Sequence, residues 1–121
     1  MEITTIKGNQ HEIAVVNSDE IVITDVQSAL DLIMSVSYET SCNRIIINKS
    51  AICDDFFDLS TKIAGDILQK FVTYKIKIAI VGDFSAYTSK SLKAFMYESN
   101  RGNDVFFLPN KEQAVEKLQR G

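Results

Sequence analysis

The sequence predicts a single α/β domain over residues 1–121, with one mixed five-stranded sheet and about four helices. Two observations predict this fold. The first stretch holds short β-branched runs separated by turn residues, as antiparallel strands do. From residue 24 onward, amphipathic helical patterns alternate with short apolar segments, which is typical of parallel strands joined by helical crossovers. A chain of 121 residues also suits one domain with one hydrophobic core.

The N-terminal part is expected to form an antiparallel meander. Strands are predicted at residues 2–7, 11–16 and 20–23. The segments between them are rich in glycine, asparagine, serine and aspartate, which are the residues that favour tight turns.

The alternating part begins with a helix predicted over about residues 25–39. Thr24 and Gln27 have the spacing of a capping box at its start. Residues 44–48 then form a continuously apolar strand, of the kind buried on both faces of a parallel sheet. Asp54 or Asp55 is expected to cap the next helix, which is predicted over about residues 56–73.

The last part continues the alternation. A strand at 76–81 precedes a helix that starts at Thr88 or Ser89 and runs to about residue 100, and Gly102 is expected to take the left-handed position after it. A strand at 105–108 leads into a helix that Asn110 caps. The centre of the single core is expected to contain Ile46, Ile63, Ile67, Phe71, Ile78, Ile80, Phe95 and Phe106.

Composition argues against several classes of protein. A net charge of −3 disfavours a nucleic-acid-binding protein, which usually carries a basic face. No apolar run is long enough to cross a bilayer and the N-terminus lacks a signal-peptide core, so a cytoplasmic protein is expected. One histidine, His11, and two cysteines without CxxC spacing predict neither a metal nor another cofactor, and make an enzyme the less favoured class.

Acidic residues follow two of the predicted buried strands, at the carboxyl ends where open α/β sheets usually bind ligands. These residues are Asp54, Asp55, Asp58 and Asp83. One interpretation is a magnesium-assisted phosphoryl site, because hard cations favour carboxylate oxygens. The favoured interpretation is structural, with Asp54 and Asp55 capping a helix and Asp83 closing a turn. No lysine or arginine is evidently placed to meet a phosphate, and no GxxxxGK[ST] loop is present.

Three aromatic residues belong to the same region. Phe57, Phe84 and Tyr87 are not expected to point inward together, and Phe57 in particular is predicted to be exposed. They would leave a partly apolar surface with an acidic rim. Because protein interfaces are enriched in aromatic side chains, this combination favours a protein partner over catalysis.

Several segments resemble a bacterial family designated domain of unknown function four-one-eight-zero. These segments are FFDLSTKIAGDILQKF, IAIVGDFSAYTSKSL and ESNRG, with TDVQSALDLI before them. The likeness covers most of the chain. The family brings no established activity, substrate or catalytic residues.

The segments RIIINKSAICDDFFDLSTKIAGDIL and FLPNKEQAVEKL also resemble the STAS domain of anti-sigma-factor antagonists. This resemblance implies that the start of the second helix is the recognition surface, where some members carry a phosphorylatable serine. Here Asp54 and Asp55 occupy that place, and they would repel an added phosphate. Ser60 and Thr61 are the remaining candidate phosphosites, although a helical setting would make them poorly accessible.

The sequence therefore predicts a non-catalytic regulatory or protein-interaction domain of STAS-like type. The residues expected to bind a protein partner constitutively are Asp54, Asp55, Phe57, Asp58, Asp83, Phe84 and Tyr87. The alternative is a small-molecule or nucleotide-binding domain, extending to weak Mg-dependent hydrolysis, that uses the acidic crevice. No nucleic-acid or membrane partner is expected, and a homo-oligomer is compatible with the pattern.

Overall fold

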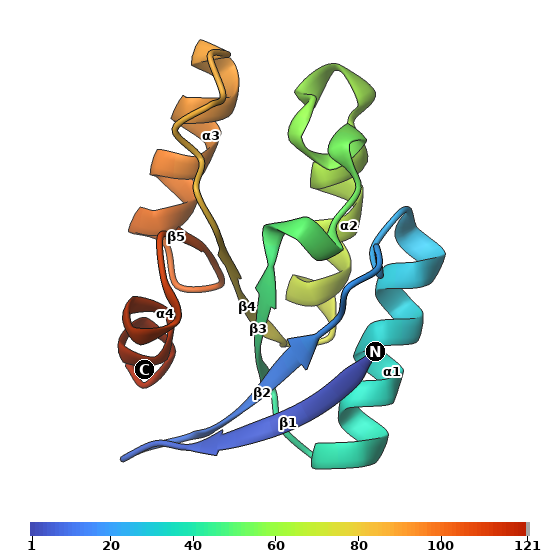
Figure 1. The fold of residues 1–121 in the computed structure, drawn as a ribbon, viewed down its shortest axis with the longest axis vertical. Coiled ribbons are helices and arrows are strands. Elements are labelled where there is room, and N and C mark those ends of the chain that lie inside the picture. Colours follow the sequence, from blue (N-terminus) through green and yellow to red (C-terminus); the bar gives the residue numbers. More distant parts are fainter. Residues whose placement is uncertain (121) are drawn as a thin grey trace.

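One mixed five-stranded sheet organises the protein, and four helices pack against it, which confirms the predicted fold class (Figure 1). The computed structural model describes residues 1–120. β1 runs antiparallel to β2, and the other neighbouring pairs are parallel, in the spatial order β1-β2-β3-β4-β5. The strands are β1 (Glu2–Lys7), β2 (Glu12–Asn17), β3 (Arg44–Asn48), β4 (Lys77–Val81) and β5 (Val105–Leu108).

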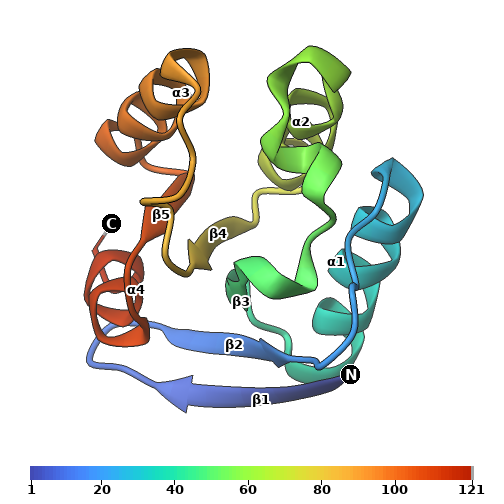
Figure 2. The same cartoon turned by 45° about the horizontal axis from the view of Figure 1, so that its top comes forward.

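The helices cover the two faces of the sheet unequally (Figure 2). Three pack on one face: α1 (Val26–Thr40), α2 (Ile63–Thr73) and α3 (Lys90–Arg101). Only the short α4 (Lys111–Leu118) packs on the other face within the described residues. Because successive side chains of a strand point to opposite faces, Ile45 and Ile47 meet the three-helix face and Ile46 meets the α4 face.

The sheet therefore separates two cores. Phe71 lies in the larger core, whereas Ile46 and Phe106 lie in the smaller core under α4. The expectation that these residues share one core is wrong, because strands buried on both faces supply apolar side chains to both. Of the other expected core residues, Ile67, Ile78 and Ile80 are buried in the larger core, and Ile63 and Phe95 are half-buried at its margin.

The strand predicted at 20–23 does not form. Only Ile23 makes an isolated parallel bridge, with Ile52, and the residues before it form a turn in which the Ser18 hydroxyl accepts the Glu20 N–H. The backbone N–H groups of Val22 and Ile23 both donate to the Ala51 carbonyl. The loop after β3, rather than a neighbouring strand, satisfies these backbone donors. Ile23 is buried without a ladder, whereas Val22 is half-buried and Ile21 is exposed.

Side-chain caps set the starts of α1, α3 and α4. The capping box of α1 is Asp25 with Ser28, not the predicted Thr24 with Gln27. Ser89 and Asn110 cap α3 and α4 as predicted. Gly102 follows α3 with φ −86°, so the left-handed position predicted for it is wrong. No helix within residues 1–120 is long and apolar enough to cross a membrane.

Candidate functional site

The carboxyl ends of β3 and β4 lie next to each other, because the parallel register pairs Asn48 with Val81. The segments that follow, 49–62 and 82–89, therefore meet at one end of the sheet (Figure 1). These segments carry every residue that the sequence predicts for partner binding, together with both candidate phosphosites. This end of the sheet is the candidate functional site.

The first segment is not the start of a long helix, as predicted, but a series of tight turns. Three 3₁₀ turns span Lys49–Ala51, Asp54–Phe57 and Leu59–Thr61, and α2 begins only at Ile63. The Asp58 side chain accepts the Ser60 N–H at 3.1 Å, which closes a local turn in competition with the helix. Lys62 then has φ 64°, outside the right-handed helical region, so α2 starts immediately after it.

Neither Asp54 nor Asp55 caps a helix, which corrects the structural interpretation of these residues. Cys53 occupies the position before their turn and Lys62 occupies the position before α2, in both cases without a side-chain cap. The side chains of Asp54 and Asp55 are exposed. Their negative charges are therefore available at the surface.

The aromatic residues of the two segments form one cluster. Phe57 is only 6 % exposed, so the prediction that it is exposed is wrong. Its ring stacks on Tyr87, with centroids 5.3 Å apart, and lies 4.9 Å from Phe56 and 6.2 Å from Phe84. The 3₁₀ geometry lets the adjacent Phe56 and Phe57 both turn inward. Phe84 and Tyr87 remain half-buried and supply the apolar part of the surface.

Lys49 is the site residue that sequence reasoning missed. Its ammonium donates to the Asp83 carbonyl at 2.6 Å and lies 4.6 Å from the Tyr87 ring centroid. A Cβ on Gly82 would come within 2.9 Å of the Lys49 side chain, so the missing side chain of this glycine makes room for the lysine. The available signal was its position directly after β3, at the same end of the sheet as the loop after β4.

Asp58 and Asp83 are held as carboxylates by their own loops. The Ser60 hydroxyl donates to Asp58 at 2.7 Å, and this bond together with the Ser60 N–H lowers the pKa of Asp58. Hydrogen bonds from Ser85 likewise lower the pKa of Asp83, with a smaller contribution from the Lys49 charge. Donors aimed at the ionised form favour it, so both groups stay negative well into the acidic range.

The candidate phosphosites Ser60 and Thr61 lie on an exposed turn rather than inside a helix, so the reason given for their poor access is wrong. Their hydroxyls are nevertheless engaged. The Ser60 hydroxyl bonds to Asp58, and the Thr61 hydroxyl donates to the carbonyls of Asp55 and Asp58, at 2.8 Å in each case. Both side chains therefore hold the turn before α2 together.

The four aspartates do not form a metal-binding cluster. Within residues 1–120, no group of three or more histidine, cysteine, aspartate or glutamate side chains is placed to hold a metal ion. The site thus combines separate exposed carboxylates, a half-buried aromatic pair and one lysine lying across that pair.

Comparison with known proteins places this chain in a family. No curated protein and no solved structure was found to match it. A family model described as "Domain of unknown function (DUF4180)" matches residues 8–118, which is nearly the whole chain and includes all of the candidate site. The protein therefore belongs to the DUF4180 family, as the resemblance of its central segments predicts.

Proposed function

We propose that this protein is a non-catalytic regulatory or protein-interaction domain of STAS-like type that binds a protein partner. The binding face is its acidic-aromatic surface, defined as Lys49, Asp54, Asp55, Asp58, Asp83, Phe84 and Tyr87. The observation that carries this proposal is a half-buried aromatic pair bordered by exposed carboxylates. Interfaces combine aromatic anchors with a charged rim in this way.

The electrostatics of the surface favour binding over acid–base catalysis. Hydrogen bonds lower the pKa values of Asp58 and Asp83, so neither carboxyl is poised to exchange protons near neutral pH. Permanent negative charge is instead what steers a basic partner toward a surface. The rings of Phe84 and Tyr87 would then provide apolar contact once the partner has arrived.

The STAS-like part of the proposal draws support from the order of elements. An N-terminal strand pair precedes alternating helices and parallel strands. Lys49, Asp54, Asp55 and Asp58 of the acidic-aromatic surface lie between β3 and α2, where the resemblance implies recognition. Asp54 and Asp55 are already negative at that place. Binding is therefore constitutive in this proposal, without a phosphate switch at Ser60 or Thr61.

The second candidate is a small-molecule or nucleotide-binding domain at the same crevice, extending to weak Mg-dependent hydrolysis. Lys49 favours it, because a cation does lie at the carboxyl ends of the strands. That ammonium already donates to the Asp83 carbonyl and lies over Tyr87, so a phosphate would have to displace it. Phosphate release from nucleotides that needs Mg²⁺ and is lost in Lys49→Ala would favour this candidate.

The experiment for the proposed function is quantitative affinity capture from an extract of the native host. The Asp54→Asn/Asp55→Asn protein should retain at most about a tenth of the partner that the wild type captures, as expected for losing roughly 1.4 kcal/mol. The control is Asp31→Asn/Glu39→Gln, which removes two exposed charges from α1. Undiminished capture by the first variant, or equal loss in both, would contradict the proposal.

A further inference from the structure

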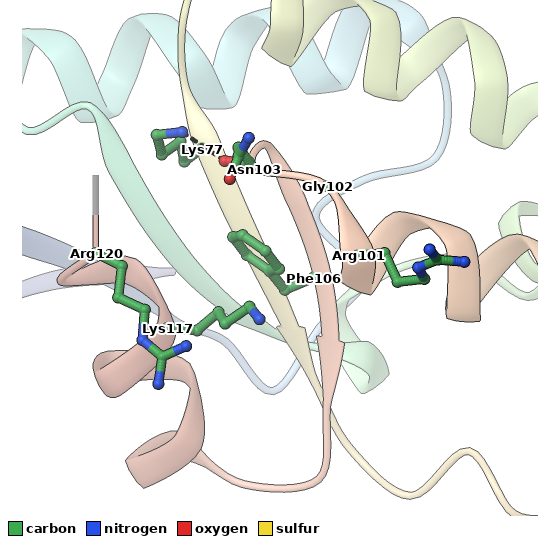
Figure 3. A pocket seen from close by; sticks show the side chains of 7 residues that line it. All are labelled: Lys77, Arg101, Gly102, Asn103, Phe106, Lys117 and Arg120. Atoms are coloured by element: carbon green, nitrogen blue, oxygen red, sulfur yellow. Dashed lines mark hydrogen bonds between the residues drawn. The ribbon is translucent and has the colours of Figure 1, made fainter.

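A cavity of about 490 Å³ lies at the opposite end of the sheet from the acidic-aromatic surface (Figure 3). It opens where β4 and β5 begin and where α3 and α4 end. Its volume lies within the range of small-molecule sites, about 300–1,000 Å³. The lining residues are Lys77, Arg101, Gly102, Asn103, Phe106, Lys117 and Arg120, and we refer to the space as the basic cavity.

The charge of this lining contrasts with that of the protein. Four of the 13 basic residues line the basic cavity, and no acidic residue does. Outside the cavity lining, the chain has nine basic residues and all 16 of its acidic residues. A concave site that gathers one sign of charge in an oppositely charged protein raises the local concentration of ligands with the complementary charge.

Three of these four cations pair with carboxylates outside the cavity lining. Lys77 is one of them, 3.7 Å from Asp104, whose side chain is 57 % exposed. Arg101 pairs with Glu98 at 3.7 Å and Arg120 pairs with Glu116 at 3.1 Å, and both partners lie outside the cavity lining. Both arginines and both glutamates of these two pairs are at least 65 % exposed. Such surface ion pairs contribute only about 0–1 kcal/mol. An anion inside the cavity can therefore compete with Glu116 for the Arg120 guanidinium at small cost.

Lys117 has no such partner among the described residues. It makes no ion pair within 4.0 Å in that part of the chain, and its ammonium lies 5.4 Å from the Phe106 ring centroid. Figure 3 shows Lys117 extending toward Phe106, with Lys77 on the other side of the ring. Helix dipoles favour cations in the last turns of α3 and α4, which accounts for Arg101 and Lys117. Lys77 lies on β4 and is held instead by its ion pair with Asp104 and by a hydrogen bond that it donates to the Asn103 carbonyl.

We propose that the basic cavity binds a phosphate-bearing small molecule the size of a nucleoside monophosphate. The guanidinium group of Arg120 offers two-pronged hydrogen bonding to phosphate oxygens, and Lys77 and Lys117 supply point charges. Arg101 lies over the Tyr97 ring, 5.7 Å from its centroid, and extends away from Phe106 (Figure 3), so it adds positive charge only at the edge of the cavity. Asn103 adds an amide at the rim, and the Phe106 ring forms an apolar floor. This site is separate from the acidic-aromatic surface and does not depend on the function proposed for that surface.

The test is isothermal titration calorimetry with AMP, inorganic phosphate and adenosine, at low and at high salt. AMP should bind saturably with one site per chain, inorganic phosphate should compete with it, and adenosine should not bind. Lys117→Gln and Arg120→Gln should each weaken AMP binding about tenfold. Lys93→Gln removes an exposed cation of α3 outside the cavity and should change binding by less than about twofold. Matching melting temperatures show that each variant is folded.

Three results would overturn the proposal. The first is the absence of saturable binding of either AMP or phosphate at low salt. The second is an equal loss of affinity in Lys93→Gln and Lys117→Gln, which would mean a general effect of net charge. The third is tighter binding of a glutamate-rich peptide than of AMP, which would assign the cavity to an acidic protein segment instead.

Discussion

The two ends of the sheet carry opposite charge. Where β3 and β4 finish, the exposed side chains include Asp54, Asp55, Asp58 and Asp83. Where β4 and β5 begin, four cations line the basic cavity. The α/β connectivity contributes to this difference, because helices that follow parallel strands start at the first end and finish at the second. Their dipoles favour anions at helix starts and cations at helix ends.

The comparison teaches that net charge describes the chain and not its surfaces. The value of −3 predicts an acidic protein, and the candidate partner surface is acidic. The same value conceals a basic cavity assembled from β4, α3, β5 and α4. This small α/β fold therefore presents two surfaces of opposite sign.

The largest expected effect concerns the phenylalanine beneath each end of the sheet. Phe57 underlies the aromatic pair and Phe106 forms the floor of the basic cavity, and both are buried. Phe57→Ala and Phe106→Ala should each lower the free energy of unfolding by about 3–5 kcal/mol, since each leaves a cavity. Urea denaturation measures both.

Tyr38→Ala is the matched control for these two variants. Its ring is 91 % exposed, so the loss should stay within about 0.5 kcal/mol. If Phe57→Ala left the free energy of unfolding almost unchanged, the Phe57 ring would have to be exposed, as the sequence predicts. A near-neutral Phe106→Ala would mean that the smaller core does not support the basic cavity.

An intermediate effect on stability is expected at Gly82, which lies against the Lys49 side chain at the acidic end of the sheet. In Gly82→Ala the new Cβ would lie 2.9 Å from the Lys49 side chain, which must then move. The cost should be about 1–3 kcal/mol, as for overpacking elsewhere. In a Lys49→Ala background the same change should cost less, because the contacts with Lys49 Cγ and Cδ at 2.9 Å are gone and only the Cβ contact at 3.2 Å remains. Equal costs in the two backgrounds would show that Lys49 does not lie against Gly82.

The smallest effect is on the acid titration of the acidic end. Asp58 and Asp83 have lowered pKa values in the folded protein, so each stabilises the fold above its unfolded pKa of about 3.9. That contribution is lost as the pH falls through the folded pKa. Ser60→Ala and Ser85→Ala remove the hydroxyl donors and should raise the pKa of Asp58 and Asp83, respectively, as NMR of the carboxyl carbons would record. An unchanged titration curve would contradict the assigned cause.

Most of the fold can be read from local patterns. The apolar runs at 45–47 and 78–80 predict buried parallel strands, because strands buried on both faces carry continuous apolar side chains. Ser89 and Asn110 predict helix starts correctly because a cap acts within three residues along the chain. Such signals depend on neighbours in sequence, so the sequence by itself determined these strands and these helix starts.

Tertiary structure decided the details of both ends of the sheet. The start of α2 depends on the left-handed Lys62 and on bonds from Thr61 back to Asp55 and Asp58, which outweigh the apolar periodicity of residues 56–73. Phe57 is buried because the loop after β4 brings Tyr87 over it. The alternation of helices and strands predicts that Phe57, Phe84 and Tyr87 share one end of the sheet, but not that Phe57 is buried. Burial and charge clustering depend on residues that are distant in sequence, so no local pattern predicts the basic cavity.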